Sequence, residues 1–457
     1  MKHSQLNQST IVALATPEGE SAIALIRLSG QKAIQIVASI FKGKDLENVK
    51  SQTLHFGRIV NKDTIVDEVL VSVFKAPQTY TGEDLVEISC HGSRFIVQSI
   101  LQLCIDYGAE TAKPGEFTMR AFLNGKMDLS QAEAVADLIH SQSEMAHKTA
   151  MHQLRGGFSS EINDFREKLI HFAALIELEL DFSEDDVEFA NRPELENLVA
   201  QIRTKVQTLI ASFKTGNVIK NGVPVVIVGK PNAGKSTLFN QLLKEDRAIV
   251  SDIAGTTRDV IEEIIDINGI QFRLIDTAGI REAKDKIEQI GIDKTYQKIE
   301  QSALLLYVFD ASTEHLEEVY ENMKDLKSDL AQVIVIANHS DKLTETESLN
   351  IPNAYLQVSA KQGHGIQTLK EHIAALFHTQ SHMQDATIIT NARHADALRR
   401  VDIALQDVQE GLLENKTGDL LSVDIRMALF ALGEITGAIE IDKDILGTIF
   451  GKFCIGK

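Results

Sequence analysis

The stretch VPVVIVGKPNAGKST, residues 223–237, constrains the fold of this chain more than any other segment. Its apolar first part, Val223–Val228, predicts a buried strand that leads directly into a loop of the pattern Gly-x4-Gly-Lys-Ser, ending at Ser236. The glycines let backbone N–H groups turn toward phosphate oxygens, and the following helix points its N-terminus at the same anion. The segment therefore predicts a doubly wound α/β domain that binds a nucleotide, with a purely structural glycine turn as the alternative.

Groups that hold a triphosphate and Mg²⁺ follow in the order that a GTPase requires. Lys235 brings a positive charge to the β- and γ-phosphates, and the hydroxyl of Ser236 is a magnesium ligand. In GTTRD, Thr256–Thr257 provides a threonine that completes the magnesium shell and senses the γ-phosphate, although threonine-rich loops are common. In RLIDTAG, Asp276 reaches Mg²⁺ through water and the Gly279 amide contacts the γ-phosphate.

The segment VIVIANHSD is typical of a guanine-binding loop after an apolar strand. The Asp341 carboxylate accepts two N–H donors that guanine presents and adenine lacks, and SAK, Ser359–Lys361, is the usual last contact with the base. Most such loops read Asn-Lys-x-Asp, whereas His339 replaces the lysine after Asn338 here. We expect guanine selectivity to be retained, because an imidazole ring can also pack on the nucleotide. The property that this replacement can alter is the affinity for the nucleotide.

The residue that usually orients the attacking water is absent. Many GTPases carry a Gln directly after Asp-x-x-Gly, but this position is Ile280, whose side chain cannot hold water. The nearby acids Glu282, Asp285 and Glu288 are candidates, with a solvated surface charge as the alternative for each. Asn232 offers an amide oxygen to a monovalent cation beside the phosphates, which would bring the charge of an arginine finger, and a turn residue is the alternative.

Apolar periodicity divides the chain into four segments. Residues 1–122 mix strands and helices, 123–220 are helical, 221–377 form the α/β segment around the glycine-rich loop, and 378–457 are helical again. We therefore predict one helical domain, made of the second and fourth segments, into which the α/β domain is inserted. Two separate helical segments are the alternative. An insertion requires the two ends of the inserted domain to lie close together, as domain termini often do.

Short patterns predict local structure at several points. Ser130–Glu133, SQAE, predicts a capping box at a helix start, and Pro193 predicts the first turn of another helix. The acidic stretch 181–189 predicts a solvated bend, Asn268–Gly269 the turn of a hairpin, and His91–Gly92 a turn after a strand.

Composition restricts the compartment and the partners. Cys90, Cys104 and Cys454 are too few and too scattered for a disulfide framework or a zinc site, which fits a reducing compartment, and we expect Cys90 and Cys104 to pack in the core. The N-terminal stretch has no signal peptide and the apolar runs are too short to span a bilayer. We therefore expect a cytoplasmic protein that does not associate with a membrane. A net charge of −19 repels polyanions on average, so nucleic acid needs a local basic patch or a partner protein.

Five segments carry a resemblance to a known family: GKPNAGKST, DIAGTTRD, DTAGIREAKDKIEQIGI, KPGEFTMRAFLNGKMDLSQAEAVADLI and the terminal FCIGK. They resemble the bacterial and organellar tRNA-modification GTPases of the MnmE (TrmE) family, over essentially the whole chain. GEFTMRAFLNGK and the Cys-x-Gly-Lys tail are the most specific, because many GTPases share the other motifs. The resemblance implies an N-terminal α+β domain that binds folate and dimerises, a helical domain, and a Ras-like P-loop GTPase α/β domain inserted into the helical one.

The same resemblance implies a reaction and its partners. Family members act as homodimers, join the flavoprotein MnmG (GidA) in a heterotetramer, and add a carboxymethylaminomethyl or aminomethyl group to the 5-position of the wobble uridine of certain tRNAs. The one-carbon unit comes from 5-formyl- or methylene-tetrahydrofolate, and FAD belongs to the partner. GTP is the substrate and GDP the product, with Mg²⁺ and K⁺ as cofactors. A partner that makes much of the tRNA contact would resolve the conflict with the net charge of −19.

Site residues of the GTPase domain follow from the resemblance position by position. The potassium site matches Asn232 with backbone oxygens near Ser251, Ile253 and Thr256; the magnesium ligands match Ser236 and Thr257; and the catalytic residues match Glu288, which acts on the attacking water through other waters, and Lys235. The implied nucleotide and cation contacts are Asn232, Ala233, Gly234, Lys235, Ser236, Thr237, Ser251, Ile253, Thr256, Thr257, Asp276, Thr277, Ala278, Gly279, Asn338, Asp341, Ser359, Ala360 and Lys361.

The resemblance also assigns a folate site. Arg27 in LIRLSG, Glu87 in LVEIS and Lys126 in LNGK match the folate contacts, and the tail folds back toward them with Lys457 near the ligand. Glu accepts from the amino and N–H donors of a pterin, while Arg and Lys meet carboxylates or carbonyl oxygens. Without the family, plain surface or strand-end charges are the alternative. Cys454 is a candidate for covalent chemistry on the uracil, which needs a thiolate, or for redox sensing, with a structural role in the site as the alternative.

Two rival functions come from other classes. A GTPase that assembles ribosomes by binding RNA usually appends a basic RNA-binding domain, which we do not find, and GEFTMRAFLNGK and the cysteine tail speak against it. A folate-binding scaffold with vestigial hydrolysis conflicts with the intact set Lys235, Ser236, Thr257 and Asp276.

Overall fold

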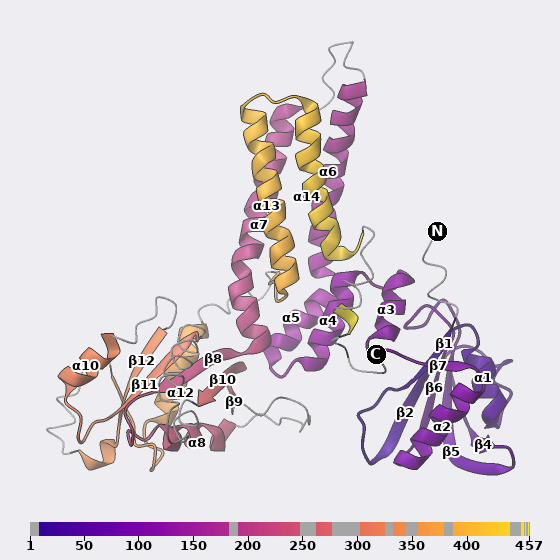
Figure 1. Ribbon diagram of the computed structural model, residues 1–457, viewed down its shortest axis with the longest axis horizontal. Helices are drawn as coiled ribbons and strands as arrows, with labels where there is room; N and C mark the ends of the chain where they lie inside the picture. The colour runs from indigo at the N-terminus through magenta and orange to yellow at the C-terminus, as the bar shows by residue number, and fades with distance from the viewer. Residues whose placement is uncertain are drawn as a thin grey trace, which may run out of the picture. The chain divides into compact units, whose positions relative to one another are not determined.

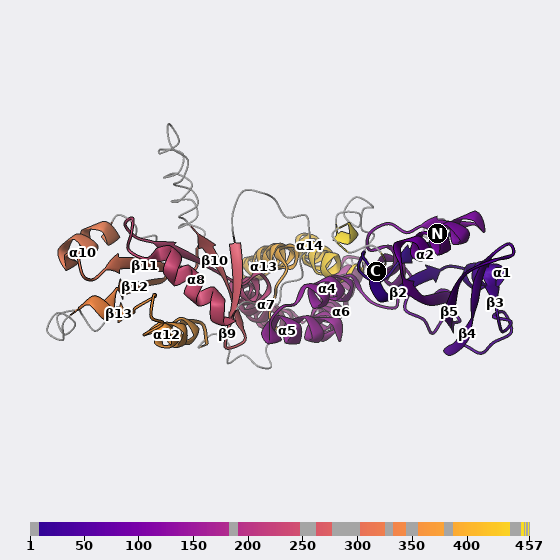
Figure 2. The ribbon, with the colours of Figure 1, turned by 90° about the horizontal axis from the view of Figure 1, so that it is seen from below.

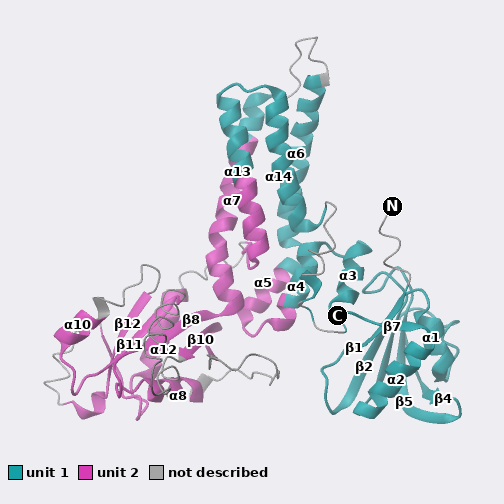
Figure 3. Cartoon of the chain, viewed as in Figure 1, with its two compact units in different colours: residues 1–136, 153–197, 403–457 teal, residues 137–152, 198–402 magenta. Residues whose placement is uncertain are grey.

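The computed structural model describes residues 9–181, 191–246, 262–276, 302–324, 332–343, 355–378, 387–438 and 449–451, together with Phe453 and Gly456. These residues belong to two compact units (Figure 3). One unit contains residues 1–136, 153–197 and 403–457, and the other contains residues 137–152 and 198–402.

A seven-stranded sheet forms the N-terminal part of the first unit, with the strand order β3-β4-β5-β6-β2-β1-β7 (Figure 1). Neighbouring strands are antiparallel except for β1 and β7, which are parallel. The helices α1 (Ala33–Ile40) and α2 (Arg94–Asp106) share one hydrophobic core with the sheet, so both cover the same face. The strands are β1 (Thr10–Leu14), β2 (Ser21–Ser29), β3 (Phe41–Lys42), β4 (Thr53–Asn61), β5 (Thr64–Phe74), β6 (Leu85–Gly92) and β7 (Ala109–Thr111).

Helices continue the first unit beyond the sheet. The short helix α3 (Glu116–Leu123) precedes α4 (Leu129–His140), and α14 (Gly418–Thr436) packs along α6 (Gly157–Asp181). Helix α14 ends at Gly437, whose φ of 77° requires the left-handed conformation that glycine adopts without strain. A side chain there would also meet the ring of Phe122, since a Cβ would lie 2.7 Å from it.

The second unit contains a six-stranded sheet with the order β13-β12-β11-β8-β10-β9 (Figure 2). Only β9 runs antiparallel to its neighbour, and β9 and β10 form the hairpin expected at Asn268–Gly269. Both faces are buried: alternate residues of β8 enter two different hydrophobic cores. The elements are β8 (Val223–Val228), α8 (Lys235–Asp246), β9 (Glu262–Ile267), β10 (Ile270–Asp276), β11 (Leu304–Asp310), α10 (Leu316–Lys324), β12 (Gln332–Asn338), the 3-10 turn η4 (Ser340–Lys342), β13 (Leu356–Gln357) and α12 (Ile366–His378).

This topology places a ligand site at the carboxyl end of β8. The chain passes from β8 to β10 on one side and then crosses to β11 on the other, so the crevice opens between β8 and β11. The expected α/β fold of the nucleotide domain, the α+β N-terminal domain and the helical domain are confirmed.

The two ends of the α/β segment meet beside helix α7 (Arg192–Asn221), which leads into β8. A Cβ placed on Gly216 of α7 would lie 1.9 Å from the carbonyl oxygen of Ile389, and the Ile389 N–H donates to Ser212 Oγ at 3.1 Å. The chain therefore leaves the helices and returns to them, ahead of α13 (Ala392–Leu413), at nearly the same point. This closeness is what an insertion requires. Helix α5 (Glu144–Leu154) completes the helices with described bounds.

Two local predictions were wrong. The capping box of α4 is made by Asp128 and Gln131: Gln131 N–H donates to Asp128 Oδ1, and Asp128 N–H donates to Gln131 Oε1, both at 2.9 Å. The predicted cap, Ser130, lies inside the helix and donates to Asp128. His91–Gly92 is the end of β6, because Gly92 pairs with Ser21 of β2 so closely that a Cβ would lie 2.1 Å from the Ser21 hydroxyl.

The other local predictions concern Pro193, the acidic stretch and membrane spans. Pro193 lies in the first turn of α7, as predicted. The predicted bend over 181–189 falls outside the described residues after Asp181. Within the described ranges, every helix is too short or too polar to cross a bilayer.

We predict that Gly216→Ala destabilises the second unit by about 1–3 kcal/mol, because the new methyl group must displace the backbone at Ile389. Urea unfolding followed by circular dichroism measures the change. The exposed neighbour Lys214→Ala on the same helix is the control, with an expected change within about 0.5 kcal/mol. Equal stability of the two variants would contradict the close approach.

Candidate functional site

The loop between β8 and α8 adopts a conformation that only its own residue types permit. Gly229 has a φ of 149°, and a Cβ on it would lie 1.9 Å from the carbonyl oxygen of Val308 on β11. Gly234 has a φ of 90°, and a Cβ there would lie 2.1 Å from Nδ2 of Asn338. The missing Cβ therefore lets the backbone of β11 approach the loop at Gly229, and it lets the side chain of Asn338 approach the loop at Gly234.

Polar groups of this loop stand where a phosphate chain would bind. Lys235 opens α8, and its Nζ donates to the carbonyl oxygens of Gly229 at 3.0 Å and Lys230 at 2.7 Å, so the ammonium lies over the loop. Ser236 and Thr237 follow in the exposed first turn. Their hydroxyls suit a cation, and the N-terminus of the helix suits an anion.

Asn232 is exposed and has a φ of 67°, in the left-handed region. This conformation is one that Asn adopts readily in turns, so it fits the turn and the cation ligand equally. The neighbouring Ala233 is buried.

The guanine loop is joined to the phosphate loop by one buried side chain. Asn338 ends β12 and is 1% exposed; its Nδ2 donates to the carbonyl oxygen of Ala233 at 2.9 Å, and its Oδ1 accepts from the N–H of Ala360 at 3.1 Å. Asp341 is exposed and its Oδ1 accepts from the hydroxyl of Ser359 at 2.6 Å. This hydrogen bond lowers the pKa of Asp341, which keeps its carboxylate an acceptor.

A cleft of about 690 Å³ lies beside this junction. Its lining includes Thr237 after the phosphate loop, Lys244 of α8, and Ala360 and Lys361 of the SAK segment. The volume falls in the range usual for small-molecule sites. The structure thus brings together the expected residues from three distant segments of the chain.

The expected folate contacts Arg27 and Glu87 lie on adjacent strands, where they are direct cross-strand partners. Arg27 Nη2 lies 2.8 Å from Glu87 Oε1, and the guanidinium carbon lies 5.7 Å from the ring centroids of Tyr80 and Phe117. From the C-terminal tail, Gly456 accepts a hydrogen bond from Arg27 Nη1 at 3.2 Å. A cationic group held by a carboxylate between two aromatic rings is a rigid recognition point.

Lys126 lies over the loop before β6. Its Nζ donates to the carbonyl oxygen of Pro77 at 2.9 Å. Its stem lies about 3.4 Å from the position that a Cβ on Gly82 would take.

Two family models match the chain. The MnmE helical domain matches residues 129–454, and the GTP-binding protein TrmE N-terminus matches residues 10–126. The tRNA modification GTPase MnmE of Cytophaga hutchinsonii is 52% identical over 450 residues, which cover 98% of each chain. That of Bacteroides fragilis is 49% identical over 467 residues, covering 99% of this chain and 100% of the relative.

The chain belongs to the MnmE family. Among solved structures, Era from Aquifex aeolicus is 30% identical over 40% of this chain and 66% of that chain, with a TM-score of 0.27. The membership therefore rests on the family models and the full-length relatives.

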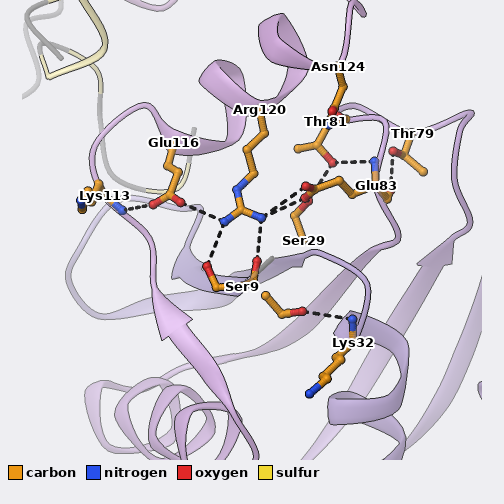
Figure 4. Close-up of polar contacts among 11 residues, drawn as sticks. Ser9, Ser29, Lys32, Thr79, Thr81, Glu83, Lys113, Glu116, Arg120 and Asn124 are labelled. Atoms are coloured by element: carbon orange, nitrogen blue, oxygen red, sulfur yellow. Dashed lines mark hydrogen bonds and ion pairs between the residues drawn. The ribbon is translucent and has the colours of Figure 1, made fainter. Parts of the chain in front are cut away.

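Sequence reasoning missed a buried charge network that supports the Arg27 site in this MnmE family member (Figure 4). Arg120 of α3 is 1% exposed; its Nη1 donates to Glu83 at 3.1 Å and to the Ser9 carbonyl at 2.8 Å, and its Nη2 donates to Glu116 at 3.0 Å. Ser29 donates to the same Glu83. The spacing of Glu116 and Arg120, four residues apart within GEFTMRAFLNGK, was the signal that could have revealed half of it.

The network joins the two elements that hold Arg27. Helix α3 carries Phe117 and the loop before β6 carries Tyr80, whose hydroxyl lies 2.9 Å from that of Thr118. The Arg120–Glu83 pair fixes the helix against this loop. The Arg120–Glu83 ion pair therefore helps to position the two rings that flank Arg27.

The two described cysteines are core residues, as predicted. Cys90 and Cys104 are 4% and 0% exposed. Burial raises the pKa of Cys90 to about 11 and that of Cys104 to about 12, so both remain thiols at neutral pH.

Several MnmE site residues lie outside the described residues, and their assignments stay predictions. They are Ser251, Ile253, Thr256, Thr257, Thr277, Ala278, Gly279, Ile280, Glu282, Asp285, Glu288, Cys454 and Lys457. Asp276 ends β10, and only its backbone is described.

We predict that Asn338→Ala weakens GDP binding by about ten- to a hundredfold, because both the Ala233 carbonyl and the Ala360 N–H lose their partner. Fluorescence titration with a labelled GDP measures the affinity. The control is Gln367→Ala on the exposed side of α12, which should bind as the wild type does. Unchanged affinity of Asn338→Ala would show that the loops are held together without this side chain.

Proposed function

We propose that this chain hydrolyses GTP in the service of tRNA modification. The observation that carries the proposal is the Asn338 junction, which unites a phosphate loop with a guanine loop. It stands in a chain that is 52% identical, over 98% of its length, to a relative named a tRNA modification GTPase. Within this proposal GTP is the substrate and GDP the product.

Phosphoryl transfer needs positive charge around the γ-phosphate more than covalent chemistry. Lys235 supplies a fixed ammonium, and the exposed hydroxyl of Ser236 suits Mg²⁺, which would draw charge from the β- and γ-oxygens. We assign Thr257 as the second protein ligand of Mg²⁺. We assign Glu288 to hold the attacking water through other waters, because Ile280 cannot.

A potassium ion is the group that we propose in place of an arginine finger. Asn232 is exposed at the rim of the phosphate loop and offers a neutral amide oxygen, which is a suitable donor for an alkali cation. Backbone oxygens near Ser251, Ile253 and Thr256 would complete its shell.

We further propose that the first unit binds a tetrahydrofolate at Arg27 and Glu87. Both contacts between Arg27 and Glu87 go to Oε1 of the glutamate, so we assign its Oε2 to the N–H donors of a pterin. The aromatic rings of Tyr80 and Phe117 hold the guanidinium in place. Lys126 and Lys457 are the further contacts, and Cys454 is a candidate for chemistry on the uracil.

The remaining expectations form one scheme. The N-terminal domain, residues 1–122, would dimerise and take the folate; the helical domain, 123–220 and 378–457, would carry the inserted GTPase domain, 221–377. A homodimer would join MnmG, which holds FAD, and would modify the wobble uridine of certain tRNAs in the cytoplasm.

We predict that GTP hydrolysis accelerates by at least about tenfold when Na⁺ is exchanged for K⁺ at constant ionic strength, because the cation neutralises charge that develops on the phosphates. A phosphate-release assay measures the rate. Asn232→Ala should lose the difference between the two salts and still bind GDP. Equal wild-type rates in both salts would refute the cation site.

Deletion of the gene tests the proposed function as a whole. We predict that mass spectrometry of tRNA nucleosides shows loss of the modified wobble uridine, restored by the wild-type chain and not by Lys235→Ala, because hydrolysis requires that ammonium. Arg27→Ala should hydrolyse GTP normally and fail to restore the nucleoside. An unchanged nucleoside profile in the deletion strain would overturn the proposal.

A further inference from the structure

Two short segments join the α/β segment to the helices: residues 216–222 at the end of α7 and residues 387–390 ahead of α13, which together we call the joint. They are packed closely against each other. A Cβ on Gly216 would lie 1.9 Å from the carbonyl oxygen of Ile389, and the Ile389 N–H donates to the hydroxyl of the buried Ser212. Because backbone is packed on backbone here, we treat the joint as one piece.

One side chain of α4 binds both segments of the joint. Asp137 Oδ1 lies 2.7 Å from Lys220 Nζ, and Asp137 Oδ2 accepts from the hydroxyl of Thr390 at 3.3 Å. Asp137 lies close to the end of α4, where the chain turns into α5, and we call residues 137–145 the corner. The two oxygens of a single carboxylate therefore tie the joint to the corner.

The ion pair is of a kind that can open and close. The side chains of Lys220 and Asp137 are 34% and 17% exposed, which is less than in a surface pair and more than in a buried one. An exposed pair contributes little, whereas a buried pair leaves a costly charge when it breaks. At intermediate exposure, water can solvate both groups once they separate. The contact therefore restrains the joint without locking it.

A cavity of about 230 Å³ is lined by residues of both the joint and the corner. Its polar lining includes Asp137, Lys220 and Thr390, and its apolar lining includes Ala146 and Ala150 of α5. A cavity of this size and polarity can hold water. Close packing would resist any shift of the joint, whereas this cavity leaves it room to move against the corner.

Gly222 is the place at which the backbone can turn. It follows the last residue of α7 and has a φ of 77°, in the left-handed region that glycine adopts without strain. Strand β8 begins at the next residue, Val223. A small residue between a helix and a strand can absorb a change in backbone angles, as hinge residues do.

The corner also contacts the sheet of the α/β segment. Gln271 of β10 is 7% exposed, and its Nε2 donates to Oε1 of Gln142 in the corner at 3.4 Å. The hairpin of β9 and β10 lies in the chain between Thr257 and Gly279, the residues predicted to contact Mg²⁺ and the γ-phosphate. A movement of this hairpin would therefore act on the same corner that Asp137 ties to the joint.

We propose that Asp137 is the latch of a hinge in this chain. With its contacts to Lys220 and Thr390 closed, the joint is held against the corner; when they open, the α/β segment turns at Gly222. The latch goes beyond the proposed function and does not depend on it, because its contacts need no ligand.

Hydrogen exchange of the full chain, followed by mass spectrometry, tests the latch in the peptides that contain Lys220 or Thr390. Asp137→Ala removes both contacts, so we expect exchange in both peptides to become about five- to tenfold faster, the size of a charge-assisted hydrogen bond. Glu144→Ala on α5 is the matched control. It removes an exposed ion pair with Lys148 and should leave both peptides unchanged.

Two further variants separate the latch from a general loss of stability. Lys220→Met should raise exchange at the end of α7, and combining it with Asp137→Ala should add nothing there, because both changes break the same pair. Asp137→Asn keeps an acceptor for Thr390 and loses the charge, so its effect should be intermediate. Thermal unfolding followed by circular dichroism checks that each variant is folded.

Two outcomes would overturn the latch. One is equal exchange of Asp137→Ala and Glu144→Ala in both peptides. The other is a rise in only one of the two peptides, because the latch joins both segments. If Asp137→Ala does not fold, Asp137→Asn decides by the same two criteria.

Discussion

The Asn338 amide is the interaction on which the nucleotide site depends. It spans from the Ala233 carbonyl to the Ala360 N–H and so holds together loops that follow three different strands. The contact is buried, where an unpaired amide is costly, so each loop constrains the other two. Gly234 contributes to this contact, because the absence of a Cβ leaves room for the Asn338 amide. The glycine-rich loop and the predicted guanine loop therefore share one physical support.

His339 lies next to Asn338 in this support, at the position where most guanine loops have a lysine. It adopts the left-handed conformation, with a φ of 62°, and its Nδ1 lies 2.8 Å from Oδ2 of Asp310 at the end of the neighbouring strand β11. The ring therefore lies between two strand ends on the same side of the sheet as the glycine-rich loop.

The first unit uses charge in another way. Arg120 is almost fully buried between Glu83 and Glu116, and burial of such groups requires that they be paired and hydrogen-bonded. The network offers a fixed geometry, because the contacts of Arg120 with Glu83 and Glu116 set α3 against the loop before β6 (Figure 4). These two elements carry the rings of Phe117 and Tyr80 beside Arg27. In the second unit, the contact of Gly216 with Ile389 brings the ends of the α/β segment together, so the helices continue past the insertion.

Local sequence patterns by themselves determine several loops and elements of this protein. The glycine-rich loop, the guanine motif and the Asn268–Gly269 hairpin depend on neighbours in the chain, because backbone conformation and hydrophobic period are local properties. Tertiary structure decided the rest. Asp128, not Ser130, caps α4, and Gly92 serves a close approach to Ser21 of another strand. The pairs Arg120–Glu83 and His339–Asp310 join residues far apart in the chain, so many partners were equally compatible with the sequence until packing and burial selected one.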